Sequence, residues 1–378
     1  MNTFERLNLS MPILQALKSK GYEIPTLIQQ KAIPLILEGR DIFGSAQTGT
    51  GKTAAFALPI LQLLSGKPSP SKHVRALVLA PTRELAEQIS QNFHAYGKHL
   101  GLKHVVIYGG VSQHGQTTAL RKGVDIIVAT PGRLLDLMNQ KFIDLSHVEC
   151  FVLDEADRMM DMGFINDIKR IASKVPASRQ TLFFSATLPV EIKRLASSLL
   201  RNPATVEIKP EAKSHTLIAQ RVYFVDKKDK TDLLCQLIKS ESINHSLVFT
   251  RTRRAADRLC KALNKAGVHA QAIHGDKSQG QRQRALDAFK DRKIKVLVAT
   301  DVASRGIDVK ELPFVINFDL PDQSESYTHR IGRTGRAGSS GMAISFCSPE
   351  ERGYLKDIQK FIGQQIPMHQ YPTLKRAV

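Results

Sequence analysis

The chain has 378 residues, of which 42% are hydrophobic and 24% are charged. This profile is typical of a globular protein with two domains and excludes a wholly disordered chain. Lys and Arg number 54 against 35 Asp and Glu, and the resulting formal charge of +19 favours a polyanionic partner such as nucleic acid.

The sequence also disfavours a membrane or secreted protein and a fold held by zinc or disulfides. It has no run of about eighteen apolar residues, and Glu5 and Arg6 lie where a signal peptide would be basic and then apolar. We therefore expect a cytoplasmic protein with no membrane contact. The four cysteines form no CxxC pair, so neither a zinc site nor a disulfide framework is predicted.

Short apolar runs, each followed by a segment of helical period, predict buried parallel strands. In the first half of the chain they occupy residues 41–46, 75–80, 105–110, 125–130, 150–157 and 181–187. The second half repeats the pattern at residues 221–225, 246–250, 270–275, 295–300, 314–319 and 343–347. The predicted fold is α/β, with two tandem domains that are each a mostly parallel sheet flanked by helices.

A polar segment that contains Pro210 separates the two halves. It predicts a linker at residues 209–218, which would let the two domains open and close. The predicted domains are therefore residues 1–208 and residues 219–378.

Residues 41–64, DIFGSAQTGTGKTAAFALPILQLL, have the order of strand, glycine-rich loop and helix. Gly49 and Gly51 would let main-chain N–H groups turn toward phosphate oxygens, and the helix N-terminus adds positive charge. Lys52 would reach the β- and γ-phosphates, and the Thr53 hydroxyl would bind Mg²⁺. An alanine replaces the first glycine of the strict GxxxxGKT pattern. We still predict a nucleoside triphosphate site.

The run CFVLDEAD ends a predicted strand with three acids. Asp154 would hold Mg²⁺ through its water shell, and Glu155 would orient and deprotonate the attacking water. A solvated acidic helix start is the alternative interpretation of these acids. GTP is disfavoured because the nearest match to a guanine-reading NKxD motif, residues 264–267, lacks the acid.

Thr82 and Thr130 each follow a predicted strand and would cap a helix, with Pro131 in the first turn of the second one. Capping alone is a sufficient explanation of these residues. The stretch HRIGRTGRAG, residues 329–338, places three arginines three apart with no carboxylate near them in the sequence, which indicates a binding site for a polyanion.

Taken together, these motifs resemble those of the DEAD-box RNA helicases. In chain order they are GYEIPTLIQ, AQTGTGKT, PTRELA, the pair Gly109-Gly110, TPGR, DEAD, SAT, LVFTRTR, HGDKSQGQR, TDVASRGID and HRIGRTGRAG. The resemblance covers the chain from about residue 4 to residue 346 and is strongest to the bacterial RhlE type. Leu27, Tyr22 and Ser304 depart from the usual residues of the family, but none of these changes removes a charged group.

The resemblance implies two tandem RecA-like domains and an ATP site. Gln29 would read adenine through its N6 and N7 edge, and arginines of the second domain would act as fingers on the γ-phosphate. The implied catalytic residues are Lys52, Asp154, Glu155, Arg333 and Arg336. The implied ATP-binding residues are Phe4, Tyr22, Gln29, Thr48, Gly49, Thr50, Gly51, Lys52, Thr53 and Asp308. The metal ligands would be Thr53 and, through water, Asp154, while His329 and Arg330 would support the interface of the domains.

The resemblance also implies an RNA track that contacts the backbone with little sequence preference. Its residues would be Pro81, Thr82, Arg83, Gly110, Thr130, Arg133, Arg251, Gln279, Arg282, Thr300 and Asp301. Asp157, Ser185 and Thr187 would couple the nucleotide site to strand separation.

The predicted function is that of an ATP-dependent RNA helicase, which hydrolyses ATP on RNA and locally separates short duplexes or remodels RNA–protein complexes. The cofactors would be ATP and Mg²⁺, and the partner a single strand or short duplex of RNA. Ribosome-assembly and RNA-decay factors are candidate protein partners. An ATP-gated RNA clamp with little unwinding and, less favoured, a DNA helicase are the alternatives.

Overall fold

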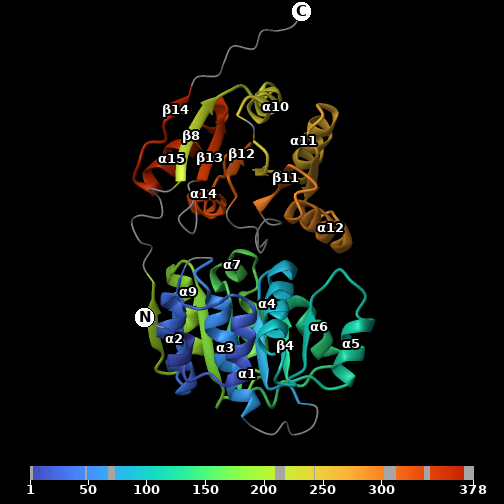
Figure 1. Cartoon of the computed structure of the whole chain (residues 1–378), viewed down its shortest axis with the longest axis vertical. Coiled ribbons are helices and arrows are strands. Elements are labelled where there is room, and N and C mark those ends of the chain that lie inside the picture. Colours follow the sequence, from blue (N-terminus) through green and yellow to red (C-terminus); the bar gives the residue numbers. More distant parts are fainter. Residues whose placement is uncertain are drawn as a thin grey trace, which may run out of the picture. The chain divides into compact units, whose positions relative to one another are not determined.

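The computed structural model describes residues 3–46, 49–66, 73–208, 218–241, 243–301, 312–335 and 341–369 (Figure 1). The chain divides into two compact units, Met1–Pro210 and Glu211–Val378. Of the predicted linker, only its last residue lies within the described residues. That residue, Ile218, begins a strand, so the second sheet starts one residue earlier than the predicted domain.

The first unit alternates strands and helices along the chain. Its strands are β1 (Ile42–Ser45), β2 (Ala76–Leu79), β3 (His104–Ile107), β4 (Ile126–Ala129), β5 (Cys150–Leu153), β6 (Gln180–Ser185) and β7 (Ala204–Glu207). Its helices are η1 (Phe4–Leu7), α1 (Met11–Ser19), α2 (Leu27–Leu37), α3 (Lys52–Ser65), α4 (Arg83–Tyr96), α5 (His114–Arg121), α6 (Pro131–Asn139), α7 (Ala156–Asp161), α8 (Ile165–Ala172) and α9 (Val190–Leu199).

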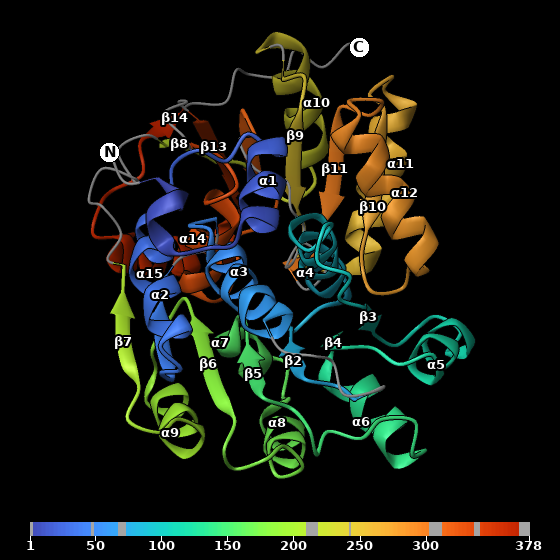
Figure 2. The same ribbon diagram turned by 60° about the horizontal axis from the view of Figure 1, so that its bottom comes forward.

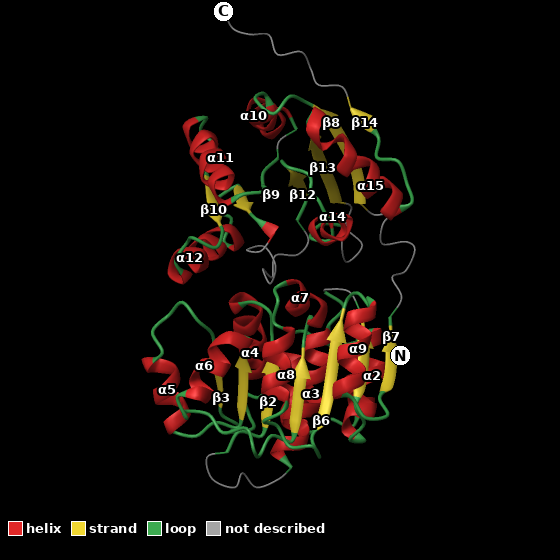
Figure 3. Cartoon of the chain, turned by 180° about the vertical axis from the view of Figure 1, so that it is seen from behind, coloured by secondary structure: helices red, strands yellow, loops and turns green. Residues whose placement is uncertain are grey.

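These strands form one parallel sheet in the order β3-β4-β2-β5-β6-β1-β7 (Figure 3). Successive side chains of a strand point to opposite faces, and here both faces are buried. Side chains of α1 to α4 join one core cluster, while side chains of α6 to α9 join the other (Figure 2). The sheet is therefore the middle of three layers.

The second unit has the same plan. Its strands are β8 (Ile218–Phe224), β9 (Ser246–Phe249), β10 (Ala270–Ile273), β11 (Val296–Ala299), β12 (Phe314–Asn317), β13 (Gly341–Cys347) and β14 (Met368–His369). Its helices are α10 (Lys230–Ser240), α11 (Arg253–Lys265), α12 (Gln279–Lys290), α14 (Ser324–Ile331), η3 (Pro349–Glu351) and α15 (Arg352–Ile362). The sheet order is β10-β11-β9-β12-β13-β8-β14, and its strand pairs are parallel.

In the second unit, α10 and α11 share one core cluster, and α12, α14 and α15 pack in the clusters of the other face. The predicted strands of both halves are confirmed, with ends that differ by a few residues. Two edge strands, β7 and β14, were missed. Both are short and lie at a sheet edge, where only part of the strand is buried and the apolar signal is weak.

Candidate functional site

The glycine-rich loop lies between β1 and α3, at the carboxyl edge of the first sheet. Gly49 and Gly51 have φ angles of 88° and 93°, a left-handed conformation that favours glycine. Lys52 begins α3 and is 6% exposed, and its Nζ donates a hydrogen bond to the carbonyl of Ala46 at 2.7 Å. The loop thus directs a helix N-terminus and a buried ammonium toward one place, as phosphate binding requires.

Gln29 lies in the first turn of α2 and joins that helix to the same loop. Its Oε1 accepts a hydrogen bond from the N–H of Thr26 at 2.9 Å, and its Nε2 donates to the carbonyl of Gly51 at 3.1 Å. Gln29 is buried, so these two hydrogen bonds lie inside the first unit. A carboxamide has two N–H groups and two oxygen lone pairs, so the capacity to bond an adenine edge remains.

The two aromatic residues expected near the base lie in different surroundings. Phe4 is buried in the core cluster of the α1 to α4 face. Tyr22 is 43% exposed, and its ring centroid lies 6.3 Å from that of Tyr96 on α4. Tyr22 is thus the one of the pair with a ring surface open to a ligand.

Asp154 and Glu155 follow β5 directly, and both are buried. Glu155 turns the chain into α7 with a φ of 53°. Burial raises the pKa of the Asp154 carboxyl above its usual range; the nearby Lys52 ammonium opposes this shift, and Glu155 adds to it. A cation bound between the phosphates and Asp154 would offset the cost of burying the charged carboxylate.

Arg158, one turn along α7, forms a close ion pair with the Glu155 carboxylate. The side chains of Arg158 and Glu155 are 7% and 5% exposed, so the pair is buried. Arg158 is not among the predicted site residues. Its place directly after the four acid-motif residues was the only signal available.

Asp157 joins the acid motif to the end of β6. Its Oδ2 accepts hydrogen bonds from the N–H of Ala186 at 3.1 Å, from the N–H of Thr187 at 2.8 Å and from the Thr187 hydroxyl at 3.0 Å. The N–H of Asp157 donates to the Ser185 hydroxyl at 3.3 Å. These hydrogen bonds bring the three residues that the resemblance assigns to coupling into direct contact.

The donor set of this edge fits Mg²⁺ better than a transition metal. Among the described residues, no three His, Cys, Asp or Glu side chains are grouped as metal ligands. Mg²⁺ keeps several waters and uses one or two protein oxygens together with substrate phosphates. The Thr53 hydroxyl in the first turn of α3 and the Asp154 carboxylate supply oxygens of this kind.

Candidate RNA residues of the first unit follow the other strands of the sheet. The Thr82 hydroxyl caps α4 by accepting a hydrogen bond from the N–H of Leu85 at 3.3 Å, as predicted. Thr130 makes no such bond at the start of α6, so the predicted hydroxyl cap is wrong there; Pro131 fills the first helical position instead. Pro81 precedes Thr82 in the turn after β2.

The loop after β3 brings two of the predicted arginines together. Gly110 has a φ of 78°, and a side chain built on it would overlap the guanidinium of Arg83. Arg133 donates to the carbonyl of Val111 at 3.4 Å, and its guanidinium lies 4.0 Å from the place of a side chain at Gly109. Three predicted RNA residues, which follow β2, β3 and β4, therefore meet at one loop.

In the second unit the candidate RNA residues also follow neighbouring strands. Arg251 comes after β9, Thr300 and Asp301 come after β11, and Gln279 and Arg282 lie in the first turns of α12, which follows β10. Strands β10, β11 and β9 are adjacent in the sheet. The structure thus places these residues along one edge.

Glu351 holds Arg251 in place and was missed by the sequence analysis. It accepts hydrogen bonds from Arg251 at 3.0 Å and from Lys230 at 2.7 Å, as well as from the N–H groups of Leu320 and Ser348. Lys230 is 1% exposed, while the Arg251 side chain is 47% exposed. Lys230 and Glu351 are 121 residues apart, and no pattern in the sequence indicates that they form a buried pair.

Arg330 differs from the expectation drawn from its sequence neighbourhood. It is almost fully buried and donates hydrogen bonds to both carboxylate oxygens of Asp301 at 2.6 Å. Arg330 is therefore already paired with a carboxylate that is distant in the sequence, and the expected polyanion site does not include it. It also donates to Asn317 and to the carbonyl of Asp319. Arg330 thus ties α14 to the ends of β11 and β12 inside the second unit and does not face outward as an interface residue.

Arg333 follows α14 and is 5% exposed. Thr50 and His329 are described, and each has at least one interaction within the protein. Thr48, Asp308 and Arg336, which the sequence analysis predicted as site residues, lie outside the described residues.

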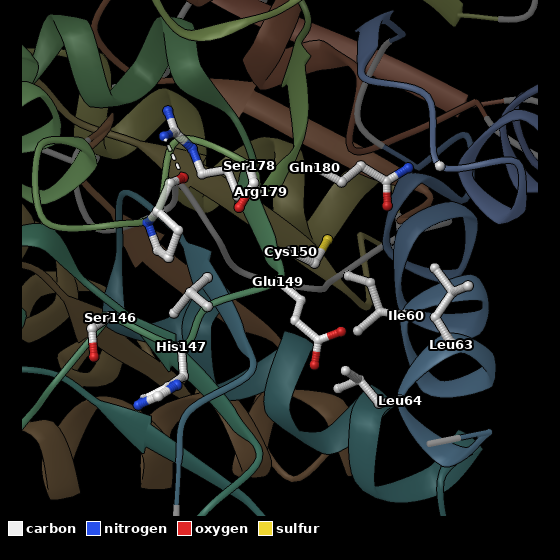
Figure 4. A pocket seen from close by; sticks show the side chains of 13 residues that line it. Ile60, Leu63, Leu64, Ser146, His147, Glu149, Cys150, Ser178, Arg179 and Gln180 are labelled. Carbon is white, nitrogen blue, oxygen red and sulfur yellow. Dashed lines mark hydrogen bonds between the residues drawn. The ribbon is translucent and has the colours of Figure 1, made fainter. Parts of the chain in front are cut away.

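A cavity of about 550 Å³ lies at the opposite edge of the first sheet (Figure 4). It is lined by the end of α3, by residues before and at the start of β5, including Glu149 and Cys150, and by Arg179 and Gln180 at the start of β6. It contains none of the predicted site residues. Ligands of open α/β sheets bind at the carboxyl ends of the strands, so this cavity is not the nucleotide site.

Comparison with protein-family models gives two matches. Residues 26–195 match the DEAD/DEAH box helicase family, and residues 229–338 match the helicase conserved C-terminal domain. No helix among the described residues has the length and apolar character needed to cross a bilayer.

The curated relatives include two that align with the whole chain. An ATP-dependent RNA helicase CshA of Listeria monocytogenes is 45% identical over 379 residues, which is 100% of this chain and 72% of the relative. A DEAD-box ATP-dependent RNA helicase CshA of Bacillus subtilis is 45% identical over 376 residues. This alignment spans 100% of this chain and 76% of the relative. These names give no support to the RhlE type that we expected.

A solved structure of S. cerevisiae Dbp5 bound to RNA and ADP BeF3 aligns with 99% of this chain and 96% of its own, at 33% identity and a TM-score of 0.87. The tandem RecA-like fold is therefore confirmed. The motifs, their order at the edges of both sheets and the full-length relatives lead to one conclusion: the chain belongs to the DEAD-box family of RNA helicases.

Proposed function

We propose that this protein is an RNA-dependent ATPase that separates short RNA duplexes locally. One observation carries the proposal most directly. The carboxyl edge of the first sheet has two halves. On one half, the adjacent strands β5, β6 and β1 lead into the acids, the Ser185-Thr187 turn and the phosphate loop, respectively. On the other half, the adjacent strands β3, β4 and β2 lead into the candidate RNA residues. Nucleotide and RNA candidates therefore share one edge, and Asp157 follows β5, the strand that borders β2 of the RNA half.

The ATP site is proposed from the residues of the first group. Lys52 and the start of α3 would bind the phosphates, and Gln29 would hold the loop and read the adenine. Bound Mg²⁺ would neutralise charge that develops on the phosphate oxygens. Thr53 and Asp154 would hold this ion, and Glu155 would accept a proton from the attacking water.

Hydrolysis is proposed to need both units. No arginine lies in the described part of the phosphate loop itself. Arg333 and Arg336 of the second unit would supply positive charge to the γ-phosphate, a contribution worth about 10³ to 10⁵ in rate in related phosphoryl transfers. ATP and RNA would then each raise the affinity for the other, because each would favour the same arrangement of the units.

The RNA contacts are proposed to be with the backbone. In both units the candidate residues are mostly threonines and arginines that follow strands or begin helices, which suit phosphate and 2′-hydroxyl groups rather than base edges. The CshA relatives are named as ATP-dependent RNA helicases, and the Dbp5 structure holds RNA and ADP BeF3, which supports the same ligands for this chain.

An RNA clamp that consumes ATP without separating strands would use the same site. Multiple-turnover release of a labelled strand from a short duplex, measured with ATPase activity on one preparation, separates the two functions. We expect strand release that depends on ATP and ATPase activity that rises with RNA but not with DNA of equal length. Hydrolysis without strand release would favour the clamp, and equal stimulation by DNA would favour a DNA helicase.

The finer assignments are also proposals. Ribosome-assembly and RNA-decay factors are the protein partners we propose, on the strength of the RNA-directed function and the charge of +19. The cytoplasmic location also stays a prediction.

A further inference from the structure

Helix α11 of the second unit has an unusual distribution of charge. Its thirteen residues include five basic ones and a single acid, Asp257. All five bases are exposed, and Arg253 pairs with Asp276, which leaves four without an ion pair to a described residue: Arg254, Arg258, Lys261 and Lys265. Their spacing of four, three and four residues places them on one face of the helix, a stripe about 16 Å long at 1.5 Å per residue. We call these four residues the α11 stripe.

The opposite face of the same helix explains why the stripe is exposed. Ala256, Leu259 and Leu263 repeat with the same period and are buried in the core cluster that also contains α10. The helix lies against β10 and β11 (Figure 2), and these residues join the side chains of both strands in that cluster. The stripe therefore points away from the sheet, and its four cations make no ion pair with any described residue.

The acid of α11 itself and the acid in the loop after β10 are engaged with other residues. Asp257 lies 2.9 Å from the Nζ of Lys277 and 3.1 Å from the Nε2 of His274. Asp276, in the loop after β10, pairs with Arg253 at 2.6 Å. Neither carboxylate neutralises the four exposed cations.

A solvated surface helix usually alternates acids and bases, because opposite charges three or four residues apart stabilise it and like charges destabilise it. The α11 stripe contains three successive like-charge neighbours: Arg254 with Arg258, Arg258 with Lys261, and Lys261 with Lys265. Folding stability alone therefore does not account for the pattern. A polyanion that binds along the stripe would remove the repulsion.

The position of the stripe indicates which polyanion. The α11 helix begins two residues after Arg251, a candidate RNA residue at the end of β9, and its N-cap is Thr252. The stripe starts beside this edge and runs along the outside of the unit. We propose that the α11 stripe is an auxiliary RNA-binding surface, which takes the phosphate backbone of the strand that leaves the track formed by the motif residues.

The inference rests on the proposed RNA-dependent function and deepens it. The motif residues would bind a short segment of RNA, and the stripe would add affinity only for RNA long enough to reach α11. Its contribution would be electrostatic, so it would carry no sequence preference and would weaken steeply with salt. Affinity for long RNA would then depend on the stripe, whereas hydrolysis at saturating short RNA would not.

The test replaces all four stripe residues by Gln in the full chain. Its matched control replaces four exposed bases of the first unit, Lys169, Arg170, Lys193 and Arg194, by Gln. Both variants lose four positive charges, so any general effect of net charge is the same in the two. Binding to single-stranded oligouridylate of about 10 and about 30 nucleotides is measured by fluorescence anisotropy between about 50 and 200 mM salt.

We expect the stripe variant to bind the short strand like the control and to lose the extra affinity for the long one. Each phosphate that the protein neutralises on a single strand contributes about 0.7 to the slope of log affinity against log salt. If the stripe neutralises at least two phosphates, its removal lowers this slope for the long strand by about 1.4. This means that wild-type affinity falls about sevenfold more than that of the variant across this fourfold salt range. Thermal unfolding at equal or higher temperature than the wild type excludes misfolding as the cause.

Equal long-strand affinity and salt slope in the stripe and control variants would overturn the inference, and the stripe would then suit an acidic protein instead. Failure of the proposed function has a different signature. In that case the wild type itself would show no stimulation of ATP hydrolysis by either strand.

Discussion

Thr187 contacts the Asp157 carboxylate twice, through its main-chain N–H at 2.8 Å and through its hydroxyl at 3.0 Å. The two residues lie 30 positions apart in the chain, and the contact joins the turn after β6 to α7. Asp157 follows Asp154 and Glu155 by only a few residues. A displacement of these acids would therefore also displace the turn after β6, through the hydrogen bonds of Asp157. We propose that this contact couples hydrolysis to strand separation.

We expect Thr187→Val to separate these two activities. Valine has nearly the same shape but lacks the hydroxyl, so one hydrogen bond to Asp157 is lost, at a cost of about 0.5–1.5 kcal/mol, while the main-chain bonds remain. RNA-stimulated ATP hydrolysis should persist, and the number of strands released per ATP should fall several-fold. Thr205→Val, at an exposed position of β7, is the control. A parallel loss of both activities would argue against coupling.

Gly110→Ala should weaken RNA binding. The new methyl group would overlap the Arg83 guanidinium, and alanine is also strained at a φ of 78°. We expect RNA affinity to fall at least ~10-fold, or ~1.4 kcal/mol, with unchanged ATP affinity without RNA. Gly109→Ala is the matched control, because its nearest neighbour is 4.0 Å away. Equal RNA affinity of the two variants would remove Arg83 and this loop from the RNA track.

Glu155→Gln should retain ATP binding and abolish turnover, because the amide cannot accept the proton of the attacking water. The ion pair with buried Arg158 adds a second effect. Glutamine is neutral, yet it can still accept a hydrogen bond from Arg158, so we expect the free energy of unfolding to fall by about 1–3 kcal/mol. Nucleotide binding and thermal unfolding are measured together with hydrolysis. Near-normal turnover would rule out Glu155 as the base.

Much of this site could be predicted from the sequence, because its residues follow strands and the carboxyl ends of parallel strands lie at one edge. The contact of Asp157 with Thr187 is an example, since each residue closely follows an apolar run. Arg330 shows where this reasoning fails. The arginines of residues 329–338 look alike in the sequence, but the position of α14 buries Arg330 against Asp301, and that position is set by tertiary packing.

The pair of Lys230 and Glu351 shows the same limit. Charged residues at helix starts are usually solvated, and no local pattern indicates that two of them are buried together. Lys230 follows β8 and Glu351 follows β13, and the two meet only because the sheet places these strands side by side. Long-range charge pairs of this type become visible only in the structure.

Glu351→Gln should destabilise the second unit and displace Arg251. Glu351 is buried and accepts hydrogen bonds from Lys230, Arg251 and main-chain N–H groups, so loss of its charge leaves Lys230 without its main counter-ion. Breaking a buried pair in this way costs about 3–5 kcal/mol, measured by denaturant unfolding. The neighbouring Glu350 is exposed, and Glu350→Gln should leave stability unchanged. Lys230→Met combined with Glu351→Gln should recover part of the loss.

The central claim is that hydrolysis needs both units, because the first holds the nucleotide and the second supplies arginines to the γ-phosphate. The most direct measurement compares RNA-stimulated ATP hydrolysis by the full chain with that of residues 1–210 alone, the first compact unit, after circular dichroism confirms that the fragment is folded. We predict a rate at least about 10³-fold lower for the fragment, with nucleotide binding retained. A folded fragment that hydrolyses ATP as fast as the full chain would contradict the claim.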